Sequence, residues 1–264
     1  MQKRWFRRLR KPVRRVLRVF LKLLGWLLVT AVALAVVGCG WLAANGWLTY
    51  RETVAEKSLP ARVEEVRSRP DYIVLEDLPA LYPDMVISVE DSRFYHHVGF
   101  DPISIIRAVL VNLHTKSFAE GGSTITQQLA KNLCFTQEKE LLRKFAELFA
   151  AHELEELYTK DEILELYINT IYYGSGYTGI EAAARGYFGV GAAYLTPVQC
   201  SLLVGLPQAP GKYSPDNDPA LTLQRQKTVV ASLLRDNVLT EKEANHLLET
   251  APMALHRWLE NSAA

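Results

Sequence analysis

Residues 23–50 read LLGWLLVTAVALAVVGCGWLAANGWLTY, a run of 28 residues without a charged side chain. As an α-helix this run would be about 42 Å long, because each residue adds about 1.5 Å, and the hydrocarbon core of a bilayer is about 30 Å thick. Trp26, Trp41 and Trp47 stand where aromatic rings favour the two membrane interfaces. The run therefore predicts one transmembrane helix, over residues 23–48.

Ten basic residues and no acidic residue precede this helix, in residues 1–22. Positive flanks stay on the cytoplasmic side of a membrane, so the pattern predicts a basic cytoplasmic segment, a single pass and an extracytoplasmic remainder. A cleaved signal peptide is the alternative, and residues 36–39 resemble a processing site that would leave a lipidated Cys39. We favour the uncleaved anchor, because the apolar run exceeds the roughly 7–15 residues of a signal core.

The remainder of the chain is acidic and has a globular composition. It carries 20 basic and 29 acidic residues, and 49% of all 264 residues are apolar. A disordered chain is therefore excluded, and a negative surface predicts no nucleic-acid partner. Cys134 and Cys200 are too few for a disulfide framework, although a single bridge between them stays open. No CxxC or HExxH spacing occurs, so we predict no metal site.

Three further segments follow from local patterns. Residues 49–74 are charged and proline-containing, which is typical of a stalk. Beyond them apolar residues recur at helical spacing, and Thr124, Thr159 and Thr196 each begin a capping signature. The sequence thus predicts a mainly α domain over residues 75–250 and a tail over 251–264. Residues 85–89 fit a strand or a helical turn. We expect the apolar helix at 103–113 to pack in the core, with insertion into the membrane interface as the alternative.

A first cluster of reactive side chains reads EDSRFYHHVGFD, residues 90–101. Its adjacent carboxylates, Glu90 and Asp91, follow an apolar run and precede histidines and a glycine. Such an arrangement suits a carboxylate that acts as a general base and is held by its neighbours. The acidic end of a surface helix would have the same composition, so the cluster alone does not decide between the two.

A second cluster reads GGSTITQQLAKN, residues 121–132. On the helix that it begins, Gln127, Gln128 and Lys131 are predicted to share a polar face. Exposed amides at a helix start, with a positive side chain one turn later, suit an anion. A well-capped surface helix is the plainer interpretation.

A third cluster comprises Lys139, Arg143, Lys144 and Glu147. Together with Lys131, the cluster places four basic groups in the fourteen residues 131–144. The part of the chain after residue 22 is otherwise acidic, so this concentration of positive charge indicates a diphosphate site. A solvated pair between Arg143 and Glu147, at i and i+4, is the alternative.

These clusters carry a resemblance to a known family. In this order, and with ILELYIN at 163–169, GIEAAA at 179–184 and LPQAP at 206–210, they resemble the peptidoglycan glycosyltransferase (transglycosylase) module, glycosyltransferase family 51, over about residues 75–240. The resemblance implies a mainly α, lysozyme-like glycosyltransferase domain preceded by one N-terminal transmembrane helix in the bacterial inner membrane. It also implies polymerisation of lipid II by β-1,4 linkage with release of undecaprenyl pyrophosphate. Because SxxK and KTG motifs are absent, we expect the monofunctional form or a truncated piece of a longer protein.

The resemblance also assigns roles to residues. It makes Glu90 the catalytic base and Glu147 a second acidic residue at the donor pyrophosphate. The substrate-binding residues that it implies are Asp91, Phe94, His97, Ser123, Thr124, Gln127, Gln128, Lys131, Asn132, Lys139, Arg143 and Lys144. Lys139 stands where arginine is usual in the family and would lack the bidentate phosphate contact of an arginine.

The expected partners are lipid II, the lipid-linked growing glycan chain and the membrane, with penicillin-binding proteins or divisome proteins as further candidates. No cofactor is required, and a divalent cation, Mg or Mn, stays open at the pyrophosphate. Two other functions are alternatives for this sequence: a lysozyme-like enzyme that cuts glycan, and an inactive cell-wall scaffold. A hydrolase needs no basic pyrophosphate site, and a scaffold needs no base, so we favour the polymerase.

Overall fold

The computed structural model describes residues 2–115, 121–135 and 140–262, and this part of the chain is mainly α-helical. The α-helices are α1 (Gln2–Glu56), α2 (Leu59–Arg67), α3 (Leu81–Glu90), α4 (Pro102–Thr115), α5 (Ile125–Cys134), α6 (Glu140–Leu157), α7 (Lys160–Thr170), α8 (Ile180–Phe188), α9 (Pro197–Leu203), α10 (Pro210–Tyr213), α11 (Pro219–Arg235) and α12 (Glu241–Ser262). Short 3-10 helices lie at η1 (Leu75–Asp77), η2 (Phe94–His96) and η3 (Ala192–Tyr194). Strands β1 (Tyr172–Gly174) and β2 (Tyr177–Thr178) form an antiparallel hairpin.

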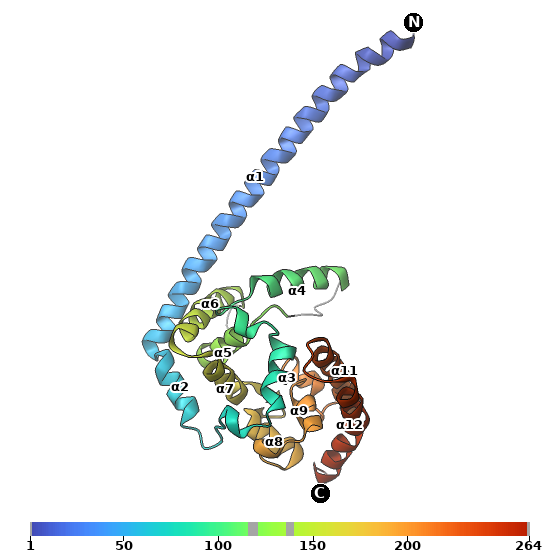
Figure 1. Ribbon diagram of the computed structural model, residues 1–264. Helices are drawn as coiled ribbons and strands as arrows, with labels where there is room; N and C mark the ends of the chain where they lie inside the picture. The colour runs from blue at the N-terminus through green and yellow to red at the C-terminus, as the bar shows by residue number, and fades with distance from the viewer. Residues whose placement is uncertain (1, 116–120, 136–139, 263–264) are drawn as a thin grey trace.

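The N-terminal helix α1 is unbroken over 55 residues. It leaves the packed helices as a single rod that ends at the N-terminus (Figure 1). The side chains of residues 19–40 are all exposed. Within the described part of the chain, residues 19–56 form the one helical stretch that is long and apolar enough to cross a membrane. The prediction of a mainly α protein with one long apolar N-terminal helix is confirmed.

The segment 49–74, predicted as a stalk, is folded into the domain. Tyr50 at the end of α1 is 7% exposed, and Leu59 and Val63 on α2 are 0% and 2% exposed; all three belong to the main hydrophobic core. Ser58 caps α2, and Pro60 lies in its first turn, where proline is well tolerated. The proline therefore helps to begin a helix, and the packed domain extends back to about residue 50 instead of beginning at residue 75.

Helices α5 and α7 form the centre of the core. α5 packs against both α6 and α7, and Ile125, Leu129, Leu164 and Ile168 are completely buried. Each such side chain contributes roughly 1.5–3 kcal/mol by leaving water. The capping boxes predicted at Thr124, Thr159 and Thr196 are all present. Residues 85–89 lie inside α3, so the ambiguous run is helical.

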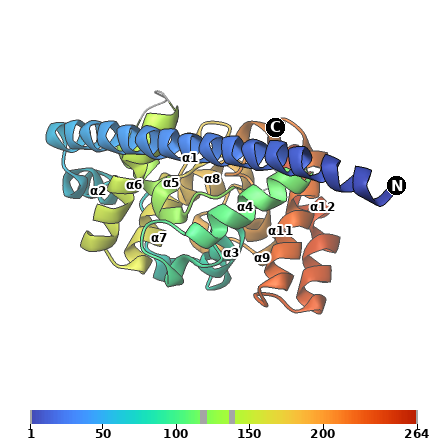
Figure 2. The same cartoon turned by 90° about the horizontal axis from the view of Figure 1, so that it is seen from above.

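Helix α4 does not pack in the core, contrary to our expectation. Ile106, Leu110 and Leu113 are 61%, 62% and 71% exposed, and Ala108 is the buried residue of this helix. α4 lies on the face of the domain above which α1 extends (Figures 1 and 2). The apolar spacing predicted the helix correctly, but it could not show that its apolar side is left uncovered by the other described helices.

Candidate active site

A cleft of about 500 Å³ lies between α3, α5, α6 and α11. Its lining contains one carboxylate and three basic side chains: Val89, Glu90, Gly121, Ser123, Gln128, Lys131, Asn132, Lys144, Ile171, Tyr172, Pro207, Gln208, Pro210 and Arg225. Because positive charge exceeds negative charge in a recess, the cleft favours an anionic ligand.

The carboxylate of the cleft belongs to Glu90, the last residue of α3. Its Oε2 accepts a hydrogen bond of 2.9 Å from Gln128 Nε2 on α5. Burial raises the pKa of Glu90 above its ordinary value, and the hydrogen bond from Gln128 and the positive charge of Arg225 act in the opposite direction. A carboxylate with a raised pKa is a stronger base, which is the property that proton abstraction from a hydroxyl requires.

Asp91 follows Glu90 but is buried away from the cleft. Its carboxylate pairs with His97 Nε2 at 2.9 Å and accepts the backbone N–H of Ile125 at 3.1 Å. These contacts tie the end of α3 to the start of α5, and therefore fix Glu90 relative to Gln128. In this geometry Asp91 and His97 fix the position of Glu90 and do not line the cleft.

The start of α5 fits the well-capped helix better than the exposed anion site, the two interpretations that the sequence left open. Thr124 donates its hydroxyl to Gly99 O at 2.6 Å and accepts the backbone N–H of Gln127 at 3.1 Å. The Gln127 side-chain oxygen, Oε1, accepts a hydrogen bond of 2.9 Å from the backbone N–H of Thr124. Gln127 is therefore buried instead of sharing the polar face of Gln128. Since Ile125 N–H is bound by Asp91, these amides serve the fold and are not free for a phosphate.

Glu147 on α6 is completely buried. It forms ion pairs with Arg143 at 3.1 Å and with Lys144 at 2.7 Å. Lys144 Nζ also lies 3.3 Å from Ser123 Oγ, which lines the cleft. A buried carboxylate is tolerated when cations surround it in this way. Glu147 therefore holds Lys144 at the edge of the cleft without lining the cleft itself.

Two cations of the cleft, Lys131 and Arg225, form no ion pair among the described residues, although Arg225 acts on Glu90 at longer range by its charge. Lys131, on α5, is exposed, and its side chain has no ion pair or hydrogen bond within the described part of the chain. Arg225, on α11, donates Nε to Gly205 O at 3.0 Å and lies 5.7 Å from the Tyr213 ring centroid. Their charges are available to a ligand.

The structure divides the residues that the sequence singled out. The predicted site residues that line the cleft are Glu90, Ser123, Gln128, Lys131, Asn132 and Lys144. Those that do not line it are Asp91, Phe94, His97, Thr124, Gln127, Arg143 and Glu147; Phe94, for example, is completely buried. Lys139 lies outside the described residues.

Sequence analysis missed three polar residues of the cleft, Tyr172, Gln208 and Arg225. Tyr172 belongs to β1, Gln208 to the turn before α10 and Arg225 to α11. The LPQAP string at 206–210 contains Gln208 and is part of the family resemblance, but the string alone does not indicate that Gln208 lines the cleft. Arg225 stands in an ordinary amphipathic pattern, and only the packing of α11 brings it to Glu90.

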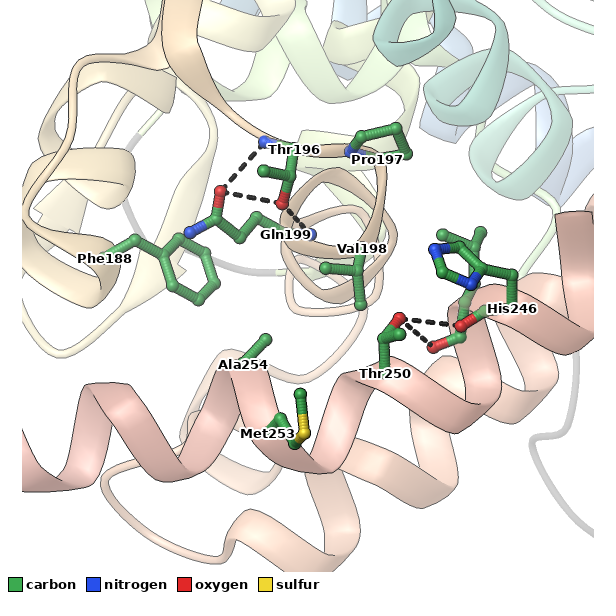
Figure 3. Close-up of a pocket in the computed structure, with 10 residues that line it drawn as sticks. Phe188, Thr196, Pro197, Val198, Gln199, His246, Thr250, Met253 and Ala254 are labelled. Atoms are coloured by element: carbon green, nitrogen blue, oxygen red, sulfur yellow. Dashed lines mark hydrogen bonds between the residues drawn. The ribbon is translucent and has the colours of Figure 1, made fainter.

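A second pocket, of about 550 Å³, lies between the start of α9 and α12 (Figure 3). Thr196 and Gln199 face it, but they are bound to one another in the capping box of α9. Thr250 donates to backbone carbonyls of its own helix. Among the residues that line this pocket, His246 is the one with an ionisable side chain. The pocket lacks the paired base and cations of the first cleft.

The chain has one helix of membrane length, followed by a helical domain. One cleft of this domain contains one carboxylate and three basic side chains. These are features of an enzyme that transfers a group from an anionic carrier. Comparison with known proteins identifies the class. The transglycosylase family model matches residues 57–234, about two thirds of the chain. The chain belongs to this family, glycosyltransferase family 51, and to the peptidoglycan glycosyltransferases.

Individual relatives agree with this assignment. A putative transglycosylase from Cupriavidus necator is 38% identical over 224 residues, which cover 84% of this chain and 91% of the relative. Penicillin-binding protein 1A from Aquifex aeolicus is 42% identical over 172 residues, which cover 65% of this chain but 24% of the relative. The chain thus spans about a quarter of that relative. A crystal structure of penicillin-binding protein 1A from Haemophilus influenzae is 27% identical, covers 47% of this chain and 15% of its own, and superposes with a TM-score of 0.33.

Proposed function

We propose that this chain polymerises the glycan strands of peptidoglycan from lipid II. In this reaction the 4-hydroxyl of the GlcNAc of lipid II attacks C1 of the MurNAc at the lipid-linked end of the growing chain. A β-1,4 bond forms with inversion, and undecaprenyl pyrophosphate leaves. The observation that carries the proposal is the presence of the single base Glu90 and the cations Lys131, Lys144 and Arg225 in one cleft.

The cleft supplies what this chemistry needs. Glu90 accepts the proton of the attacking hydroxyl, and Gln128 fixes the direction of its carboxylate. Lys131 and Lys144 stabilise the negative charge that develops on the leaving pyrophosphate. An inverting displacement with so good a leaving group needs one base and no carboxylic acid on the other side. Glu147 is therefore not required as a second catalytic carboxyl, and its two ion pairs suit it to orient Lys144.

The cleft fits a divalent cation poorly. Magnesium and manganese prefer several oxygen ligands, carboxylates above all. The lining offers one carboxylate beside three basic side chains, and the described residues contain no group of three or more His, Cys, Asp or Glu that could hold a metal. We therefore assign the pyrophosphate charge to the lysines and derive no step through a metal.

Purified full-length protein and labelled lipid II test the proposal. Formation of a glycan polymer, with release of the lipid pyrophosphate, is the expected result. Shortening of preformed glycan without polymer would favour the lysozyme-like hydrolase. An intact protein that binds lipid II but leaves both substrates unchanged would favour the scaffold.

We further propose that the chain is anchored in the bacterial inner membrane by α1, with the catalytic domain outside. The basic residues before the apolar run favour this orientation. The exposed apolar side chains of α4, on the face above which α1 extends, suit contact with the same membrane. A cleft in a domain seated in this way would meet a lipid-linked substrate without extracting it from the bilayer.

A reporter fusion checks the orientation. Alkaline phosphatase joined to the C-terminus is expected to be active, because it folds and forms its disulfides only outside the cytoplasm. The same fusion with residues 1–50 deleted serves as the control and should be inactive. An inactive full-length fusion in a stably produced protein would reverse the orientation and place the cleft away from exported lipid II.

The raised pKa of Glu90 predicts the pH dependence of the reaction. The base works only when ionised, so activity should fall as pH decreases through this pKa, at a higher pH than for an ordinary carboxyl. Arg225 lowers the pKa of Glu90 by its charge. Arg225→Met should therefore raise this pKa and move the acidic limb of kcat/KM to higher pH.

The check is a pH profile of kcat/KM for wild type and Arg225→Met. The loss in the variant should be larger on the acidic side of the profile than on its plateau, because the variant's base is ionised again at the higher pH. Arg235→Met, on the same helix but outside the cleft lining, is the matched control. An equal loss at every pH would mean that Arg225 does not act on the ionisation of Glu90.

A further inference from the structure

Helix α1 packs against α6 where it joins the domain. Gly46 and Tyr50, one turn apart on α1, are buried, whereas their neighbours Trp47 and Leu48 are exposed. The Tyr50 ring stacks with that of Phe149 on α6, with the ring centroids 6.3 Å apart. The end of the membrane-length helix is therefore one wall of the catalytic domain and not a free linker.

The contact is closest at Gly46. A Cβ atom built on Gly46 would lie 2.5 Å from Phe145 Cβ, 3.0 Å from Phe145 C and 3.1 Å from Ala146 N. Two of these atoms are backbone, so a side-chain rotation cannot relieve the contact. Glycine is a poor helix former, and small residues allow two helices to approach closely. By contrast, Gly40 on the same helix has nothing within 4 Å of its Cβ position.

The part of α6 that touches Gly46 also carries the charged side chains of the site. Phe145 follows Lys144 in the chain, and Ala146 precedes Glu147. Glu147 pairs with Lys144 at 2.7 Å, and Lys144 reaches Ser123 in the cleft lining. A shift of the α6 backbone at 145–146 must therefore move this lysine relative to the cleft.

We propose that the Gly46 contact between α1 and α6 sets the position of Lys144, so that the membrane helix positions a pyrophosphate-binding cation as well as anchoring the protein. Gly46 is in this sense a positioning residue. The inference rests on the proposed function for the identity of the anion, and on the geometry of α1, α6 and the cleft for the rest.

A single added methyl group tests the contact. Gly46→Ala should force the two helices apart by roughly 1 Å, because ordinary contacts with a Cβ begin near 3.4 Å. Displacements of about 1 Å at a preorganised site cost up to about 100-fold. We expect the affinity for inorganic pyrophosphate to fall by about tenfold and KM for lipid II to rise more than kcat falls. Gly40→Ala makes the same change on the same helix without a neighbour, and should leave both unchanged.

A double-mutant cycle shows whether Gly46 acts through the lysine. In the Lys144→Ala background the cation is already lost, so Gly46→Ala should lower pyrophosphate affinity little further. The same factor in both backgrounds would overturn the proposal, as would wild-type affinity in Gly46→Ala. If Gly46→Ala does not fold, Tyr50→Leu weakens the same interface without a backbone clash, and unchanged pyrophosphate affinity in that variant would also overturn it.

These measurements separate the two proposals. Inorganic pyrophosphate binding by the full-length protein needs no turnover, so the Gly46 effect can be scored even if lipid II is not polymerised. Absence of lipid II turnover in wild type would contradict the proposed function alone. Normal turnover in wild type with no effect of Gly46→Ala would contradict the positioning role alone.

Discussion

Glu90→Gln is expected to lower the rate of lipid II polymerisation by about 10²- to 10⁴-fold, the usual effect of losing a general base. A sugar hydroxyl is a poor nucleophile near neutral pH, and Glu90 is the only carboxylate among the described residues that line the cleft. The amide of glutamine keeps the shape of the side chain and an oxygen that can accept the hydrogen bond from Gln128. The variant therefore loses the base and little else.

The measurement is single-turnover polymerisation of labelled lipid II by the purified variant and wild type. Melting temperature and affinity for inorganic pyrophosphate, determined on the same preparations, show whether the cleft has stayed intact. Glu249→Gln, on an exposed face of α12, controls for the chemical change itself. Near-normal turnover in Glu90→Gln would remove Glu90 from the mechanism. Loss of pyrophosphate binding together with turnover would show a collapsed site instead of a missing base.

The local features of this fold could be predicted because short-range chemistry determines them. The capping boxes at Thr124, Thr159 and Thr196 each depend on two residues three positions apart, and all three form. The uncharged run at 23–50 likewise favoured a long helix. Inside a membrane a single segment can satisfy all of its own backbone hydrogen bonds only as a helix. Such features need no knowledge of the rest of the chain.

The features that could not be predicted depend on packing between distant segments. Periodicity identified the apolar side of α4. It could not show that this side is exposed, because exposure depends on where the other helices pack. Charge and prolines at 49–74 suggested a stalk, but Leu59 and Val63 on one side of α2 fill the core. Arg225 lies 135 positions after Glu90 in the chain and reaches the same cleft only because α11 packs beside α3.

The same distinction explains which of the predicted site residues line the cleft. Gln127 and Gln128 are adjacent and chemically identical, yet the capping box turns Gln127 inward and leaves Gln128 to bind Glu90. Glu147 was predicted as a second acidic residue of the site, and the structure places it outside the cleft lining in ion pairs with Arg143 and Lys144. Residue type and spacing therefore indicated candidate residues, whereas the direction of each side chain depends on packing that spacing does not describe.

Lys131→Ala is expected to lower kcat/KM for lipid II by about 10²-fold, the scale for losing one preorganised charge contact to a developing anion. Lys131 lies one turn after Gln128 on α5, and thus close to the base, and no carboxylate pairs with it among the described residues. Its whole charge is therefore available to the pyrophosphate. Lys144, by contrast, shares its charge with Glu147.

Steady-state kinetics and pyrophosphate affinity of Lys131→Ala measure this effect. Lys227→Ala removes another exposed lysine, from α11 and outside the cleft, and should retain wild-type kinetics. Lys131→Arg keeps the charge and should recover most of the loss if electrostatic stabilisation is the cause. Because the Lys131 side chain forms no hydrogen bond or ion pair among the described residues, its truncation should change the melting temperature little. A loss below about threefold would reduce Lys131 to an ordinary surface lysine and leave Lys144 and Arg225 as the cations of the reaction.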